Sequence, residues 1–136
     1  MKTRNRTIYI TQADMNRLRS LIESMKSSRE DLKTLRAELD QAHLVAPADI
    51  PPDVITMNSK AQLRDLEDSE LMTYTLVFPA KANADEGLIS VLAPIGTAML
   101  GHRVGDEFEW HVPAGTIHLR VEKVLYQPEA AGHYNL

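Results

Sequence analysis

Cysteine is absent from this chain of 136 residues, and aromatic side chains make up only 5% of it. Without cysteine the protein can form no disulfide scaffold, no thiol nucleophile and no cysteine-ligated zinc or iron–sulfur site. No apolar run approaches the ~18 residues that a membrane helix needs. The charged start of the chain, with Lys2, Arg4 and Arg6, is not followed by the apolar segment of a signal peptide. We therefore expect a cytoplasmic location.

Positive charge is scarce in the larger, C-terminal part of the chain. Residues 47–136 carry six basic and thirteen acidic side chains, a net charge of −7, whereas residues 11–46 are balanced and residues 1–10 carry +3. An acidic surface repels a phosphate backbone, so we expect no direct binding of nucleic acid. A basic protein surface is the more natural partner for residues 47–136.

The pattern of residues 11–46 predicts two short helices. Thr11 stands three residues before Asp14, which is the spacing of a capping box at the start of a helix. Apolar residues then recur at spacings of three and four in two runs: Met15, Leu18, Ile22 and Met25, followed by Leu32, Leu35, Leu39 and Ala42. Because a short polar segment separates the runs, residues 1–46 are predicted to form a short antiparallel helical hairpin, a small coiled coil whose base packs on the rest of the chain.

Residues 47–136 are predicted to form a second unit of strands and turns. Pro47, Pro51 and Pro52 end the helical pattern and mark the boundary, since proline lacks the backbone donor that a helix needs. Pro94 suits the first turn of a helix that runs to about Leu100 and stops at Gly101. Strands are expected at residues 54–57, 61–64, 72–78, 88–92, 107–112 and 117–122, so the fold class is α+β.

The last two strands are expected to pair as a hairpin with their apolar residues on one face. A four-residue loop from Pro113 to Thr116 gives a register that keeps both apolar faces together. The facing residues are then Val112 with Ile117, Trp110 with Leu119, Glu109 with Arg120, and His111 with His118. Two facing histidines are a conceivable metal pair. No third ligand is evident, so we expect two solvated histidines instead.

The order and spacing of several short motifs resemble the C-terminal domain of the Gre transcript-cleavage factors. The matching segments are Val54 to Ser59, Leu88 to Gly96, Leu100 with Gly101, and Val104 to Asp106. The segment Tyr126 to Gly132 resembles a Gre-related bacterial type that has a shorter hairpin. The resemblance implies an FKBP-like antiparallel β-sheet domain with one helix. It also implies binding to the rim of the secondary channel of RNA polymerase, and a link to nucleoside diphosphate kinase as a second candidate partner.

The predicted hairpin tip contains Arg29, Glu30 and Asp31. In the Gre factors, acidic residues at the tip hold a magnesium ion for transcript cleavage, so the resemblance makes Glu30 and Asp31 weak metal candidates. Helix capping is the stronger interpretation, because Ser27 and Glu30 have capping-box spacing and acids suit the first turn of a helix. We therefore expect no metal and no cofactor.

The resemblance also implies a partner-binding segment at residues 92–96: Leu92, Ala93, Pro94, Ile95 and Gly96. Gre factors carry an Asp/Asn-Ser-Pro step here that contacts the polymerase. Pro94 matches that step, whereas Leu92 and Ala93 replace its two polar residues. Apolar contacts with the polymerase and simple strand-to-helix packing are equally compatible with this pattern.

No catalytic residues are expected. The sequence has no Walker motif, no GxGxxG and no nucleophile elbow around a serine. Peptidyl-prolyl isomerase activity, an alternative for an FKBP-like fold, needs an aromatic-lined pocket that few aromatics are left to build. The sequence thus predicts a monomeric, non-enzymatic polymerase regulator, with an active cleavage factor and an isomerase or ligand-binding domain as the alternatives.

Overall fold

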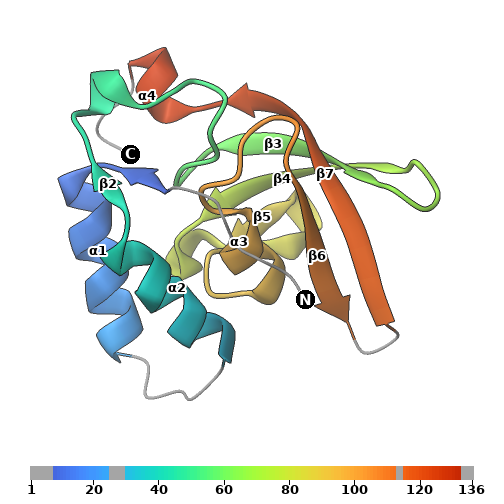
Figure 1. The fold of residues 1–136 in the computed structure, drawn as a ribbon, viewed down its shortest axis with the longest axis horizontal. Coiled ribbons are helices and arrows are strands. Elements are labelled where there is room, and N and C mark those ends of the chain that lie inside the picture. Colours follow the sequence, from blue (N-terminus) through green and yellow to red (C-terminus); the bar gives the residue numbers. More distant parts are fainter. Residues whose placement is uncertain (1–7, 25–29, 113–114, 133–136) are drawn as a thin grey trace.

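The computed structural model describes residues 8–24, 30–112 and 115–132, and it combines three longer helices with a curled five-stranded sheet (Figure 1). The α-helices are α1 (Gln12–Ser24), α2 (Glu30–Asp40), α3 (Pro94–Met99) and α4 (Pro128–Ala131). The strands are β1 (Tyr9–Ile10), β2 (His43–Leu44), β3 (Lys60–Asp65), β4 (Leu71–Val77), β5 (Leu88–Ser90), β6 (Glu107–Val112) and β7 (Gly115–Tyr126). Three short 3₁₀ turns complete the described elements: η1 (Pro47–Asp49), η2 (Pro79–Lys81) and η3 (Ala84–Glu86).

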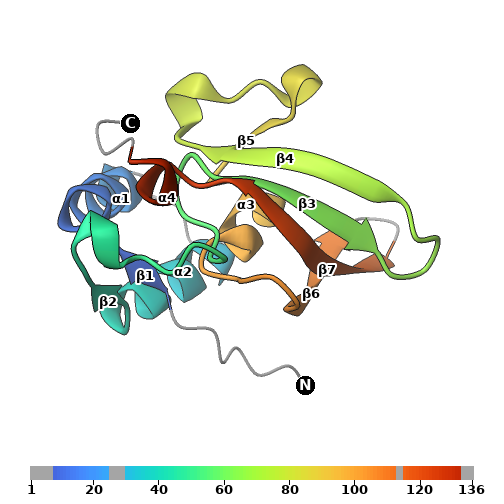
Figure 2. The ribbon, with the colours of Figure 1, turned by 90° about the horizontal axis from the view of Figure 1, so that it is seen from above.

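The main sheet has the strand order β5-β4-β3-β7-β6. Its pairs are antiparallel except one: β5 runs parallel to β4, with Thr75 opposite Leu88. The prediction of an antiparallel sheet is therefore wrong at this edge. The turns η2 and η3 carry the chain back along β4 between Val77 and Leu88, so β5 starts in the same direction as β4. Figure 2 shows how the strands twist around α3.

Strand β7 is twelve residues long and pairs with both β3 and β6. Its pairing with β3 shifts register between Lys60 and Ala61 and again between Gln62 and Leu63. Such bulges increase the local twist of a strand. The bent sheet thus keeps one face against α3 and the helical hairpin (Figure 2).

The β6–β7 hairpin has a different register from the predicted one. Residues Pro113 and Ala114 separate the two strands, so the loop is two residues shorter than expected. The observed partners are Glu107 with Arg120, Phe108 with Leu119, Glu109 with His118, Trp110 with Ile117, and His111 with Thr116. The shift is an even number of positions, which preserves the expected apolar face while changing every facing pair. The alternation along the strands determines only which residues share a face, because several turn lengths keep the same face together.

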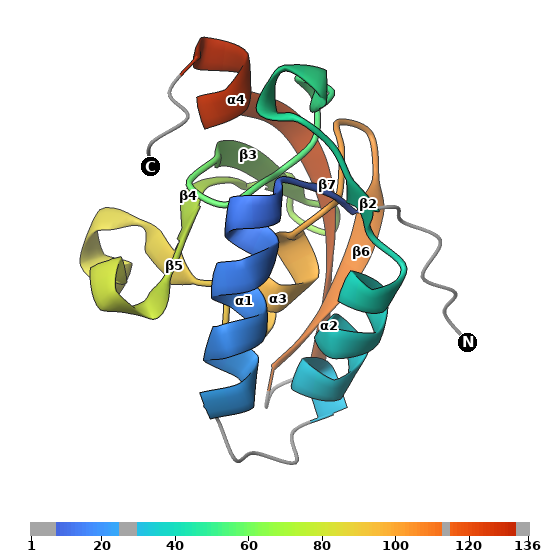
Figure 3. The ribbon, with the colours of Figure 1, turned by 90° about the vertical axis from the view of Figure 1, so that its left-hand side faces the viewer.

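The helical hairpin is present, and its apolar stripes share one core with the sheet. Leu18, Ile22, Leu35 and Leu39 are each at most 3% exposed and belong to the same cluster as Ile55, Leu63 and Leu119. Figure 3 shows α1 and α2 side by side, with α3 behind them. Outside this core, Arg19 of α1 reaches Asp40 of α2 at 2.8 Å. Met25 lies outside the described residues, as does the side chain of Leu32.

The second helix ends earlier than predicted. It stops at Asp40, so Ala42 is not part of the helical stripe. The chain instead enters β2, which pairs in parallel with β1. Backbone amides of His43 and Val45 donate hydrogen bonds to the carbonyl oxygens of Ile8 and Ile10, at 2.8 and 3.1 Å. These bonds hold residues 43–45 alongside residues 8–10, just before the linker begins at Pro47.

The predicted strand over residues 54–57 is not a regular strand. Only Val54 forms a β-bridge, with Arg103, while Ile55 exchanges backbone hydrogen bonds with Gly101 and His102. A turn follows at once: the Ser59 hydroxyl accepts the Thr56 amide at 2.9 Å, and Asn58 has a φ of 69°. Because this turn breaks the extended chain, regular pairing begins only at Lys60. The predicted strand 72–78 and the helix starting at Pro94 are confirmed, with β4 one residue earlier at each end.

Candidate functional site

The step from β5 into α3 is held firmly by backbone and hydroxyl contacts. The Ser90 hydroxyl accepts the Leu92 amide at 3.0 Å, and the Ser90 carbonyl accepts the Ala93 amide at 3.0 Å. The Thr97 hydroxyl, one turn into the helix, donates to the Val91 carbonyl at 2.6 Å. These bonds replace the backbone pairing that the chain gives up where the strand ends. The first turn of α3 is therefore fixed on the end of β5.

Only part of the predicted partner-binding segment reaches the surface. Ile95 is 5% exposed and lies in the core, and Gly96 is buried against the backbone of Ser90. Leu92 and Ala93 are half-buried, while the side chain of Pro94 lies outside the described part. Of the five candidates, Leu92 and Ala93 thus have described side chains that are open to solvent. Ile95 and Gly96 have packing roles.

The predicted hairpin tip is described only in part. Glu30 and Asp31 begin α2, in agreement with their predicted place in a first helical turn. Arg29 and the predicted capping residue Ser27 lie outside the described residues, as do the side chains of Glu30 and Asp31. Capping and metal binding by these two acids both remain predictions.

The predicted pair of facing histidines is wrong, because the register moves them apart. His111 lies opposite Thr116, whereas His118 lies opposite Glu109, with its Nδ1 3.8 Å from the Glu109 carboxylate. Within residues 8–24, 30–112 and 115–132, no group of three or more His, Cys, Asp or Glu side chains is placed to hold a metal ion. The outer face of the sheet instead carries ion pairs: the Glu122 carboxylate accepts from Arg120 and Arg64 at 2.8 and 3.1 Å. The bond from Arg120 is the main cause that lowers the pKa of Glu122.

A pocket lies where the start of α1 meets the linker and α4. Its volume is about 340 Å³, and it extends from the first turn of α1 to Pro128 and Glu129 of α4. The remaining wall is formed by the linker and the turn before β3. The lining residues are Thr11, Gln12, Ala13, Asp14, Val45, Ala46, Pro47, Met57, Asn58, Pro128 and Glu129. The pocket therefore joins the helical part of the chain to the sheet part.

Two buried carboxyl groups line this pocket. Asp14 is 7% exposed and Glu129 is 9% exposed. Glu129 accepts a hydrogen bond from the Thr56 hydroxyl at 2.8 Å, and that hydroxyl also bonds the Ser59 hydroxyl at 2.9 Å. Thr11 caps α1, since its hydroxyl accepts a hydrogen bond from the backbone amide of Asp14 at 3.2 Å. The predicted start of α1 is thereby confirmed, and the Asp14 carboxyl group is left for the pocket.

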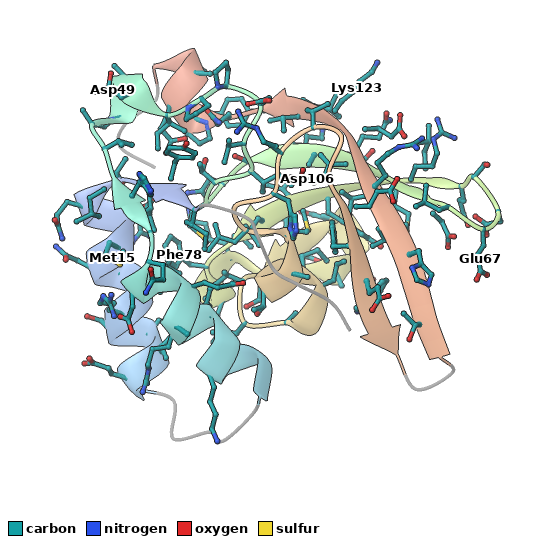
Figure 4. All side chains as sticks on the ribbon, viewed as in Figure 1. Met15, Asp49, Glu67, Phe78, Asp106 and Lys123 are labelled. Atoms are coloured by element: carbon teal, nitrogen blue, oxygen red, sulfur yellow. The ribbon has the colours of Figure 1, made fainter. Side chains whose placement is uncertain are left out.

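Burial and a like charge both act on Asp14. Its pKa is raised from 3.8 to about 6, first by burial and then by repulsion from Glu129, while Arg17 acts in the opposite direction. Arg17 is a distant counter-ion, because its guanidinium lies 4.0 Å from the Asp14 carboxylate. The same guanidinium lies 3.9 Å from the ring centre of Phe78, which Figure 4 shows beside α1. Arg17 therefore neutralises Asp14 only in part.

The variant Asp14→Asn is expected to be more stable than the wild type at pH 7. Because the folded state holds the Asp14 proton more tightly than the unfolded chain, wild-type stability falls as pH rises from 3.8 to about 6. The full loss corresponds to about 3 kcal/mol. Urea unfolding at pH 3.5 should give nearly equal free energies of unfolding for the wild type and Asp14→Asn. At pH 7 the variant should be more stable by the whole difference.

The exposed Asp85→Asn is the matched control, because it removes the same charge from the surface turn η3. It should change stability by less than about 0.5 kcal/mol at either pH. Equal behaviour of the two variants would show that the Asp14 carboxylate is as well solvated as a surface group.

The carboxyl pair was not found from the sequence. The sequence places Asp14 only in a helix cap, and Glu129 has no neighbour in the sequence that signals burial. The position of Glu129 depends on Gln127, whose side-chain amide donates to the carbonyl oxygens of Pro51 and Val54 at 2.7 and 2.6 Å. The available signal was Pro128, which suits the first position of a helix and places Glu129 in the first turn of α4.

Comparisons with known proteins cover nearly the whole chain. Residues 50–126 match the family model described as transcription elongation factor GreA/GreB, C-terminal part, and residues 6–45 match the Rnk N-terminus. The regulator of nucleoside diphosphate kinase from Escherichia coli K12 is 44% identical over 132 residues, which are 96% of this chain and 97% of that protein. The transcription elongation factor GreA of Prosthecochloris aestuarii is 32% identical over 105 residues, 76% of this chain and 66% of that factor.

A solved structure supports the same relationship. The transcription elongation factor GreA/GreB from Nitrosomonas europaea superposes with a TM-score of 0.78 at 40% identity, covering 88% of this chain and 98% of that one. A curled α+β sheet preceded by two helices is thus the architecture of a GreA/GreB factor, and this chain belongs to the GreA/GreB family. Within that family its first part is of the Rnk type, as its match to the Rnk N-terminus shows.

No helix in the described ranges is both long and apolar enough to cross a membrane.

Proposed function

We propose that this protein is a regulator that binds RNA polymerase at the rim of its secondary channel and has no catalysis of its own. The observation that carries the proposal is the match of both parts of the chain, in order, to the Rnk N-terminus and the GreA/GreB C-terminal part. The proposal includes an FKBP-like description of the sheet, a coiled-coil description of the hairpin, a division at residues 46 and 47, a monomer and a cytoplasmic location.

The charge of the larger part supports a basic protein partner. Residues 47–136 carry a net charge of −7. Acidic side chains lie at opposite ends of the molecule: Figure 4 places Asp49 near α4 and Glu67 at the turn between β3 and β4. An acidic surface of this kind attracts a basic rim at long range and accelerates association at low salt.

The short hairpin supports regulation rather than cleavage. Helix α1 has 13 residues and α2 has 11, so each arm is about 20 Å long or less by helix rise. The apolar stripes of both arms are buried in the same core as the sheet. The described parts of both helices are therefore anchored to the sheet, and their reach into a channel is short.

The protein is expected not to stimulate transcript cleavage. One acidic pair, Glu30 and Asp31, stands at the start of α2, beside Arg29 in the sequence. A cleavage assay on a backtracked elongation complex, with a GreA factor as the positive control, checks this expectation. Robust cleavage that disappears in a Glu30→Ala/Asp31→Ala double variant would instead identify an active cleavage factor.

The segment 92–96 is expected to contact the polymerase through its exposed part. Ala93 is half-buried at the start of α3. The variant Ala93→Arg introduces a charge there and should weaken binding to purified polymerase more than tenfold. The thermal melt should change little, because Ala93 is not among the residues packed in the core. Surface plasmon resonance with immobilised polymerase measures the affinity, and added salt should slow association.

The matched control is Ala130→Arg, which adds the same charge to the exposed Ala130 of α4 and should leave the affinity nearly unchanged. Normal affinity in a folded Ala93→Arg variant would move the interface elsewhere. Absence of binding by the wild type would contradict the proposed function itself. A parallel pull-down with purified nucleoside diphosphate kinase tests the second partner, which the name of the Escherichia coli relative suggests.

A further inference from the structure

We infer that the pocket between α1, the linker and α4 binds a small aliphatic amine, whose ammonium group is held between Asp14 and Glu129. This inference does not depend on the proposed polymerase contact, because none of residues 92–96 lines the pocket. It rests on a pocket that is open to solvent on one side, on two carboxyl groups in its lining that have unused acceptors, and on the apolar side chains that share the lining.

The carboxyl groups have acceptor capacity that the described residues do not use. No donor in the described ranges makes a hydrogen bond to the Asp14 carboxylate, and its one ion contact, with Arg17, is at 4.0 Å. Glu129 accepts one hydrogen bond, from Thr56. Two ionised carboxyl groups offer about eight acceptor positions in total. Both carboxyl groups line the pocket, so an occupant of the pocket can donate hydrogen bonds to them.

The charge balance at the pocket selects a cation. None of the lining residues is basic, and both ionisable ones are acidic. The start of α1 contributes about half a positive charge, which is much smaller than the negative charge of two carboxylates. Burial is the first cause that raises the pKa of Asp14, and repulsion from Glu129 is the second. A bound cation would relieve this repulsion.

The apolar part of the lining favours an organic cation over a metal ion. Beside the polar residues Thr11, Gln12 and Asn58, the lining contains the apolar residues Val45, Ala46, Pro47, Met57 and Pro128. A magnesium ion bound by two carboxylates keeps several waters, and the apolar side chains of the lining cannot hydrogen-bond to that shell. An ammonium group instead donates three hydrogen bonds, while its carbon chain can lie against the apolar side chains. The volume of about 340 Å³ is at the lower end for small-molecule sites.

Calorimetric titration of the full-length protein with 1,4-diaminobutane at pH 7 and low salt tests this inference. We expect saturable binding with a dissociation constant of about 1 mM or tighter. The variants Asp14→Asn and Glu129→Gln should each bind at least tenfold more weakly. Both substitutions preserve shape, and circular dichroism with the urea midpoint shows whether each variant is folded.

Two controls separate a site from general attraction between charges. Asp85→Asn and Glu86→Gln remove the same charges from the exposed turn η3 and should bind like the wild type. The uncharged analogue 1,4-butanediol should not bind. Equal affinity in Asp14→Asn and Asp85→Asn would overturn the inference. So would equal binding of the diol, or saturable binding of Mg²⁺ with no response to the diamine.

Discussion

Replacing Leu35 with alanine is expected to lower the free energy of unfolding by about 2–5 kcal/mol. Leu35 is 0% exposed, and it joins α2 to the cluster that contains α1 and the sheet. The substitution removes three carbon atoms from a site enclosed on all sides by other elements. The remaining cavity costs more than the lost transfer free energy alone, because packed neighbours relax only in part. Urea unfolding followed by circular dichroism gives the difference.

Leu44→Ala is the matched control for Leu35→Ala. Leu44 is 52% exposed in β2, so the same truncation should cost less than about 0.5 kcal/mol there. A similarly small cost at Leu35 would contradict the packing of the two helical stripes on one another.

Gly96→Ala is expected to be the second most damaging change, with a loss of about 3 kcal/mol. A Cβ atom at this position would overlap the carbonyl oxygen of Ser90 and lie 2.9 Å from its carbonyl carbon and 3.1 Å from the Val91 Cα. These are backbone atoms, so no side chain can rotate away to make room. Helix α3 would have to move off the end of β5 and break the bond from Thr97 to Val91.

Gly132→Ala provides the comparison. Gly132 has a φ of 79°, with nothing within 4 Å of an added Cβ, so the change there costs only the backbone strain of about 1–2 kcal/mol. Thermal unfolding should give Gly96→Ala a clearly lower melting temperature than Gly132→Ala. The reverse order would mean that α3 is free to shift at its start.

The sequence predicted the elements whose signals are local. Thr11 marks the start of α1, Pro94 marks the start of α3, and both are confirmed because caps and prolines act within one turn of the helix. The apolar stripe through Leu18 and Leu35 predicted which helix faces are buried. Periodicity gives such faces directly, since the same residues face the core whatever lies opposite.

The features that depend on distant partners were not predicted. Strand β2 forms because His43 and Val45 meet the carbonyls of Ile8 and Ile10, more than thirty residues earlier in the chain. The register of β6 and β7 depends on the turn length, which the alternation of Phe108 and Trp110 does not determine. The pocket acids Asp14 and Glu129 come from opposite ends of the sequence. Only the folded chain brings them together.

The two edges of the main sheet bear on how this protein behaves at high concentration. An open edge presents unpaired amides and carbonyls to which a strand of another copy can add. One edge here is β5, with only three residues. The other is β6, where Glu107 and Glu109 alternate with the residues of the core. A short edge and a like-charged edge both disfavour addition of a further strand, which protects the sheet against aggregation in a crowded solution.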